Sequence, residues 1–197
     1  MGANDVIRLL DSFTYIITGF LQASGTRTRL IELWQKLHAE SRPRKDVVRL
    51  LPWASDWESE AEFIQRLSDG NYNIRIAAYS WGAGWGSIQL CKALQRRGMD
   101  VSHLALIDPV HRHPNPLRRW RTLFPGCCPI EIPSNATANV LWFGQTQNWP
   151  RSHKIVGEDK HWQPPKMINI SCTHQNMDDH YAVIESVYKF IQRDAGD

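Results

Sequence analysis

Ser80 lies in the stretch RIAAYSWGAGWGS, residues 75–87, between an apolar run and a segment with helical periodicity. A serine hydroxyl becomes a nucleophile when a nearby base takes its proton, and a sharp strand-to-helix turn exposes the Oγ atom for this chemistry. Such a turn needs very small residues two positions before and after the serine, and Ala78 and Gly82 meet that need. Two further glycines would let the next helix lie close to the sheet. A serine here also suits a helix N-cap, so the pattern has two interpretations.

Candidates for the base and for its supporting acid follow Ser80 along the chain. Histidine serves well as a base near neutral pH. His174 lies just past the last apolar run that predicts a strand, and Asp108 directly follows an earlier one, LALIDPV. A histidine in a surface loop and an Asx turn before Pro109 are the structural alternatives. His180 is a second candidate base, but we expect it inside the first turn of the final helix, pointing away.

Apolar periodicity and turn residues divide the chain into alternating strands and helices. The predicted strands are 13–20, 46–53, 73–80, 101–109, 139–146 and 166–173, and the predicted helices are 27–40, 55–68, 84–98 and 178–193. This alternation predicts one α/β domain over residues 1–197, with a mostly parallel central sheet and helices on both faces. Ligands of such sheets gather at the carboxyl ends of the strands, which is where Ser80, Asp108 and His174 should lie.

Helix ends carry recognisable signals. Ser55 and Glu58 have capping-box spacing at the start of the second helix, and Gly98 suits the C′ position of the third. Asp178 and Asp179 should cap the final helix. The proline-rich segment 109–138 has no clear period, so we expect an irregular excursion that forms a small cover over the site, with no room for a large lid domain.

The sequence A-Y-S-W-G at 78–82 resembles the G-x-S-x-G nucleophile elbow of the α/β-hydrolase family, with alanine at the first small position. The order of elements is similar along nearly the whole chain. The resemblance implies a serine nucleophile, an acid and a histidine in that order, with His174 as the base after the final strand. The family usually places the acid after the next-to-last strand, where this chain has LWFGQTQNWP and no carboxylate. Pancreatic-type lipases place it one strand earlier, in a similar Asp-Pro sequence, which favours Asp108 over the alternative Asp159.

The resemblance also implies an oxyanion hole made by two backbone N–H groups. One is the N–H of Trp81, the residue after the serine. The other comes from the loop after the first strand, in ITGFLQASGT, where Phe20 is the first candidate and Leu21 the second. Gly19, just before them, could instead simply end the strand.

Nine tryptophans are many for 197 residues. Most should pack in the core, because aromatic side chains bury large areas. A minority could line an apolar acyl pocket, and we name Tyr79, Trp85 and Trp149 as candidate substrate contacts.

Composition excludes several classes of function. The formal net charge is +3, and the basic run HRHPNPLRRWR at 111–121 is more typical of a solvated loop than of an anion-binding surface. We expect no nucleic-acid partner, no membrane span, no signal peptide and, from four cysteines without zinc spacing, no metal. A cytoplasmic protein without a cofactor is therefore expected.

Together these features predict a serine hydrolase that cleaves a carboxylic ester with an apolar acyl group, of lipase, esterase or thioesterase type. Two alternatives remain. The chain could be a hydrolase-like binding or interaction protein without turnover, given the missing carboxylate at the usual place, or a peptidase or acyltransferase on the same fold.

Overall fold

The computed structural model describes residues 10, 12–20, 28–41, 46–68, 72–112, 115–117, 119 and 128–193. The expectation about a signal peptide, which concerns the first residues, and the second oxyanion candidate, Leu21, lie outside the described residues. So does much of the basic run at 111–121.

A six-stranded, all-parallel sheet forms the centre of the molecule, in the order β2-β1-β3-β4-β6-β8. Its strands are β1 (Ser12–Thr18), β2 (Asp46–Pro52), β3 (Asn73–Tyr79), β4 (His103–Ile107), β6 (Val140–Gly144) and β8 (Ile168–Asn169). The predicted α/β class with a mostly parallel sheet is confirmed. β1 and β4 are buried along their whole length, as expected for central strands covered on both faces.

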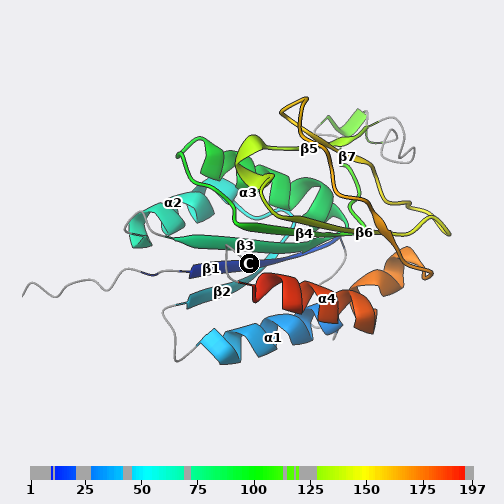
Figure 1. The fold of residues 1–197 in the computed structure, drawn as a ribbon, viewed down its shortest axis with the longest axis horizontal. Helices are drawn as coiled ribbons and strands as arrows, with labels where there is room; N and C mark the ends of the chain where they lie inside the picture. Colours follow the sequence, from blue (N-terminus) through cyan, green and yellow to red (C-terminus); the bar gives the residue numbers. More distant parts are fainter. Residues whose placement is uncertain are drawn as a thin grey trace, which may run out of the picture.

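Two helices cover each face of this sheet (Figure 1). These helices are α1 (Arg29–Ser41), α2 (Trp57–Leu67), α3 (Ser87–Gln95) and α4 (Tyr181–Ile191). Successive side chains of a strand point to opposite faces, so Tyr15 and Ile17 pack with α2 and α3, whereas Ile16 packs with α1 and α4. The apolar stripe of each helix meets one of these two faces, which gives a three-layer arrangement.

Two predicted helix starts are wrong in detail. The N-cap of α2 is Asp56, whose Oδ1 accepts the Ser59 N–H at 3.2 Å, and the Ser55 hydroxyl donates instead to the Pro52 carbonyl at 2.9 Å. Asp178 and Asp179 do not cap the final helix, because they lie in a preceding 3₁₀ segment, η4 (His174–Asp179). Asp179 Oδ1 accepts the N–H of Arg29 at 3.1 Å, at the start of α1, so a tertiary contact outcompetes the local cap.

The predicted end of the third helix is confirmed. Gly98 has φ +68°, and the bonds from Gly98 N–H to Gln95 O and from Met99 N–H to Leu94 O, both 3.0 Å, form a Schellman motif. The last predicted strand is much shorter than 166–173, because only Ile168 and Asn169 pair with β6 at the sheet edge.

The described part of the segment 109–138, for which the sequence predicts an irregular excursion, includes short regular elements. It contains β5 (Ile130–Ile132) and a 3₁₀ turn, η3 (Ser134–Ala136), and β5 pairs in parallel with β7 (Ile155–Gly157). Asn135 Nδ2 donates to the carbonyls of Met99 (2.7 Å) and Cys91 (3.1 Å), which fastens this layer to α3. Three-residue strands are too short to show periodicity in a sequence. The described part of the chain holds no large extra domain.

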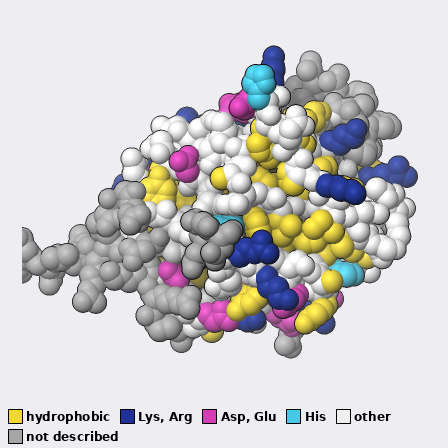
Figure 2. Space-filling view, in the orientation of Figure 1, with side chains coloured by type: hydrophobic (Ala, Val, Ile, Leu, Met, Phe, Trp, Pro, Cys, Tyr) yellow, Lys and Arg dark blue, Asp and Glu magenta, His cyan; other side chains and the backbone are white. Residues whose placement is uncertain are grey.

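Charged side chains of both signs lie scattered over the face seen in Figure 2. Among the helices that the structure describes, none is both long and apolar enough to cross a membrane.

The turn after β3 packs unusually tightly against the segment after β4. A π-helical turn, η1 (Gly82–Gly86), precedes α3, and a Cβ atom added to Gly84 would lie 2.1 Å from the carbonyl oxygen of Val110. The contacted Val110 atoms belong to the backbone, so they cannot rotate away from an added methyl group. The sequence predicts that Gly84 lets the helix lie close to the sheet, whereas the structure shows its close approach to the segment after β4.

We expect Gly84→Ala to lower the free energy of unfolding by more than about 3 kcal/mol, because the new methyl group must displace backbone. Gly98→Ala is the control, because a Cβ atom added to Gly98 would have nothing within 4 Å. Its positive φ alone should cost about 1 kcal/mol. Urea denaturation measures both, and equal losses would contradict the packing argument.

His153, in the segment that joins β6 to β7, is fully buried, and no described residue forms a hydrogen bond with either of its ring nitrogens. The backbone N–H of His153 donates to the Pro109 carbonyl at 2.8 Å, so the residue lies against the segment that follows β4. Burial lowers the pKa of His153 from 6.5 to about 4, and the charge of His111 contributes in the same direction.

This shift predicts acid sensitivity. The unfolded chain takes up a proton on His153 near pH 6.5 and the folded chain only near pH 4, so stability falls as pH drops between these values. The loss should be about 3 kcal/mol. His153→Gln should abolish this part of the difference between stabilities at pH 7 and pH 4, whereas the exposed His161→Gln should not. Unchanged pH dependence in His153→Gln would refute this assignment.

Candidate active site

Ser80 directly follows β3 and has a left-handed backbone conformation, with φ +56°. For a residue other than glycine this conformation costs roughly 1–2 kcal/mol. Three backbone bonds hold it: Ser80 N–H donates to Ile107 O (3.0 Å), and Ser80 O accepts from Gly84 (2.8 Å) and Val110 (3.1 Å). The strained turn lies between a buried strand and a helix start, the position at which the sequence pattern predicts it.

His174 lies next to this serine, with its Nε2 atom 2.9 Å from Ser80 Oγ. It is the first residue of η4 and is largely buried. The backbone of His174 is fixed on both sides: its N–H donates to Asn148 Oδ1 (2.8 Å), and its carbonyl accepts the hydroxyl of Tyr79 (2.6 Å). The rings of His174 and Tyr79 also stack, with centroids 5.2 Å apart.

Asp108 is fully buried and its Oδ2 atom lies 2.6 Å from His174 Nδ1. Its other oxygen accepts the Gln145 N–H at 3.2 Å. Asp108 also has a positive φ, +45°, and its N–H donates to Phe143 O at 2.8 Å. An ionised carboxylate only accepts, so this geometry assigns the proton of a neutral imidazole to Nδ1 and directs the Nε2 lone pair toward Ser80.

The structure thus brings together Ser80, His174 and Asp108, which the sequence separates by up to 94 positions. The alternative acid, Asp159, is exposed, and its Oδ1 accepts the His161 N–H at 2.8 Å in a local turn. The alternative base, His180, is the N-cap of α4, one position before the helix itself.

The first residues after β1 lie against Ser80. A Cβ added to Gly19 would lie 2.8 Å from the Cβ of Ser80, so only glycine allows this approach. Phe20, the next residue, has its ring 4.3 Å from that of Trp81. Among the described turns, loops and caps, no backbone bond uses the N–H of Trp81 or Phe20. The two residues named as oxyanion donors therefore lie side by side, Trp81 at the start of η1 and Phe20 just after β1.

The three residues named as substrate contacts have different surroundings. Tyr79 is buried beneath His174, so its side chain supports the histidine rather than lining an open surface. Burial raises the pKa of Tyr79 well above its usual range, which keeps its hydroxyl a donor. Trp85 is half-buried, and Trp149 is exposed beside Asn148.

An amide cluster after β6 stands where the sequence lacks a carboxylate. Gln145 is fully buried. Its Oε1 accepts the N–H groups of Gln147 (2.9 Å) and Asn148 (3.0 Å), and its Nε2 donates to Pro150 O at 2.7 Å. This loop holds both Asp108 and the backbone of His174. In the sequence these amides are noticeable only because they occupy the place where the family usually has the acid. Their clustering there is the one signal that could have predicted a supporting role.

A second buried carboxyl, Asp178, belongs to the same 3₁₀ segment as His174. Burial raises its pKa to about 6, and the charge of Asp179 adds to the rise. Ionised Asp178 in turn raises the pKa of Tyr79.

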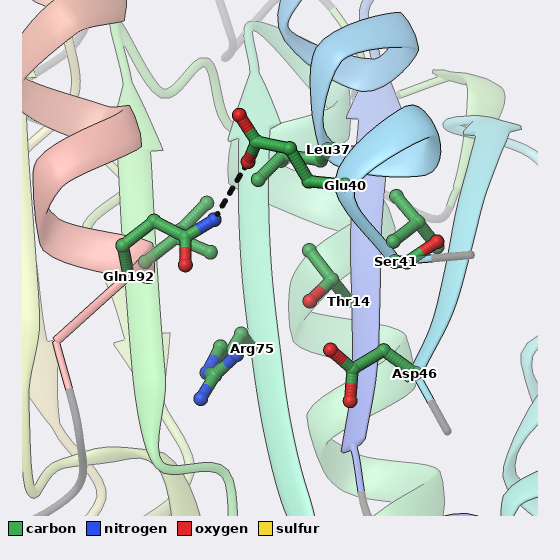
Figure 3. A pocket seen from close by; sticks show the side chains of 9 residues that line it. Thr14, Leu37, Glu40, Ser41, Asp46, Arg75 and Gln192 are labelled. Carbon is green, nitrogen blue, oxygen red and sulfur yellow. Dashed lines mark hydrogen bonds between the residues drawn. The ribbon is translucent and has the colours of Figure 1, made fainter. Parts of the chain in front are cut away.

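A small polar pocket lies at the opposite edge of the sheet (Figure 3). Thr14 and Asp46, near the starts of β1 and β2, line it together with Arg75, and Glu40 accepts a bond from Gln192 at 3.2 Å across it. Its lining residues include no histidine or cysteine. Within the described ranges, no cluster of three or more His, Cys, Asp or Glu side chains could hold a metal ion.

Comparison of the chain with protein-family models, with curated proteins and with solved structures gave no match.

Proposed function

We propose that this protein is a serine hydrolase that cleaves carboxylic esters through an acyl-enzyme. One observation carries the proposal: a serine Oγ in a strained turn, 2.9 Å from an imidazole Nε2 whose Nδ1 lies 2.6 Å from a buried carboxylate. The all-parallel α/β sheet is compatible with the resemblance to α/β-hydrolases.

In the proposed reaction, Ser80 Oγ attacks the ester carbonyl while His174 Nε2 takes the hydroxyl proton. Asp108 stabilises the imidazolium that forms. The backbone N–H groups of Trp81 and Phe20 would bind the negative oxygen of the tetrahedral intermediate. When this intermediate collapses, the C–O bond to the alcohol breaks and His174 returns the proton to the leaving oxygen. A water, deprotonated by the same imidazole, then releases the acid and restores the serine.

The aromatic side chains next to Ser80 favour a substrate with an apolar acyl group. Phe20 is half exposed, and its ring lies 4.3 Å from Trp81 and 6.2 Å from Trp53. Such a surface would bind an acyl chain through burial of apolar area.

Removing either Ser80 or His174 should nearly abolish turnover. Ser80→Ala and His174→Ala should each lower kcat for p-nitrophenyl esters by about 10⁴-fold or more, and the double variant should lose little further, because the two side chains act as a unit. Additive losses would contradict a shared mechanism.

A fluorophosphonate probe separates this proposal from a binding protein without turnover. The folded wild type should be labelled at Ser80, and Ser80→Ala should not. Graded p-nitrophenyl esters tested beside aminopeptidase substrates should show ester hydrolysis that depends on acyl length. A folded protein that takes no label would sink the proposal.

Asp108→Asn should lower kcat by about 10⁴-fold while the fold persists, because the amide cannot hold the tautomer that leaves Nε2 free to accept. The matched control is Asp159→Asn, which makes the same change in an exposed turn and should leave kcat within about twofold of wild type. If the control loses activity and Asp108→Asn does not, Asp108 is not the acid.

A further inference from the structure

Arg112 lies over a cluster of three tryptophans beside Ser80. Its guanidinium carbon is 4.4 Å from the ring centroid of Trp53, 5.4 Å from Trp81 and 5.8 Å from Trp85. Trp81 directly follows the proposed nucleophile in the chain. Arg112 lies two residues after Val110, whose N–H donates to the carbonyl of Ser80 at 3.1 Å. The cation therefore lies over the residue that follows Ser80, in a segment whose backbone is bonded to Ser80.

The Nε atom of Arg112 is buried, and no described residue accepts a hydrogen bond from it. Among the described residues no carboxylate forms an ion pair with Arg112. A buried donor without a partner costs free energy, so its persistence calls for an explanation. The neighbouring Arg119 adds positive charge and, after burial, contributes to lowering the pKa of Arg112.

Stacking on indole rings uses the faces of a guanidinium and leaves the N–H groups in its plane. Those in-plane donors match the two oxygens of a carboxylate. The tryptophans fix the orientation of the group before a ligand arrives, which reduces the entropy lost on binding.

From this geometry we infer that Arg112 forms a subsite for a carboxylate on the substrate, so that the preferred ester carries an apolar chain ending in a negative charge. This inference rests on the proposed esterase activity. The aromatic rings of Phe20, Trp53 and Trp81 would contact the chain, and Arg112 would bind its charged end. Arg112 acts on specificity and takes no part in the bond-breaking steps.

Binding is tested first, in Ser80→Ala, which does not depend on turnover. Tryptophan fluorescence is titrated with adipate and, for comparison, with hexanoate, which lacks the second carboxylate. We expect adipate to bind at least about tenfold more tightly than hexanoate, because a charge-assisted pair is added. Adding Arg112→Gln should remove this preference, and Arg112→Lys should restore part of it. Equal binding of the two acids, or a preference that survives Arg112→Gln, would overturn the inference.

Hydrolysis is tested second, with mono-p-nitrophenyl adipate and p-nitrophenyl hexanoate. The ratio of kcat/KM for the charged ester to that for the neutral ester should exceed one in the wild type and fall about tenfold in Arg112→Gln, mainly through KM. Arg193→Gln is the control, because it removes the same charge from an exposed site beyond α4 and should not change the ratio. Rapid hydrolysis of both esters with an unchanged ratio would refute the subsite alone. Hydrolysis of neither, with adipate still bound through Arg112, would refute the esterase proposal alone.

Discussion

The geometry at the carboxyl ends of β3 and β4 depends on two neighbouring left-handed turns, at Ser80 and Asp108. Each turn places a polar side chain just beyond a buried strand, where the chain would otherwise continue in the sheet direction. Neither conformation is favourable for its residue, so both need support from the surrounding backbone. Ser80 receives it from three hydrogen bonds, and Asp108 from the carbonyl of Phe143 and the N–H of Gln145. Close packing of Gly84 against Val110 joins the two turns into one unit.

The histidine is positioned differently, by a loop rather than by a strand end. β8 is only two residues long, so the sheet itself gives little control over the segment that carries His174. Side chains supply that control. Tyr79 supports the ring and the carbonyl from below, and Asn148 holds the N–H. Polar groups that are buried and fully bonded in this way specify one arrangement, because every alternative leaves a donor or acceptor unsatisfied.

The end of the sheet formed by the carboxyl ends of its strands differs from the end formed by their amino ends. At the carboxyl ends, Gly19 and Gly84 allow the residues just after β1 and after β4 to contact the Ser80 turn. Arg112 lies over aromatic rings at the same end. Near the amino ends of the strands lies a small polar pocket, and a hydrogen bond from Gln192 to Glu40 crosses it. All strands of a parallel sheet run in the same direction, so their carboxyl ends lie together at one end of the sheet and their amino ends at the other. Ligands of such sheets bind at the carboxyl ends.

By itself, the sequence determined the alternation of strands and helices, the parallel sheet and the places of Ser80, Asp108 and His174 along the chain. These features are local: apolar period, small residues around a serine, and polar residues directly after buried runs. The sequence favoured Asp108 over Asp159 only through the family resemblance, and tertiary structure decided that Asp108 meets His174, because the sheet order places β4 next to β3. It also decided that Asp179 caps α1 and that the short strands β5 and β7 pair. Contacts of Gln145 with Asp108, of Asn148 with His174 and of Arg112 with Trp81 were likewise decided by tertiary structure. Each of these depends on contacts between residues far apart in sequence, and their geometry is fixed only when the layers pack.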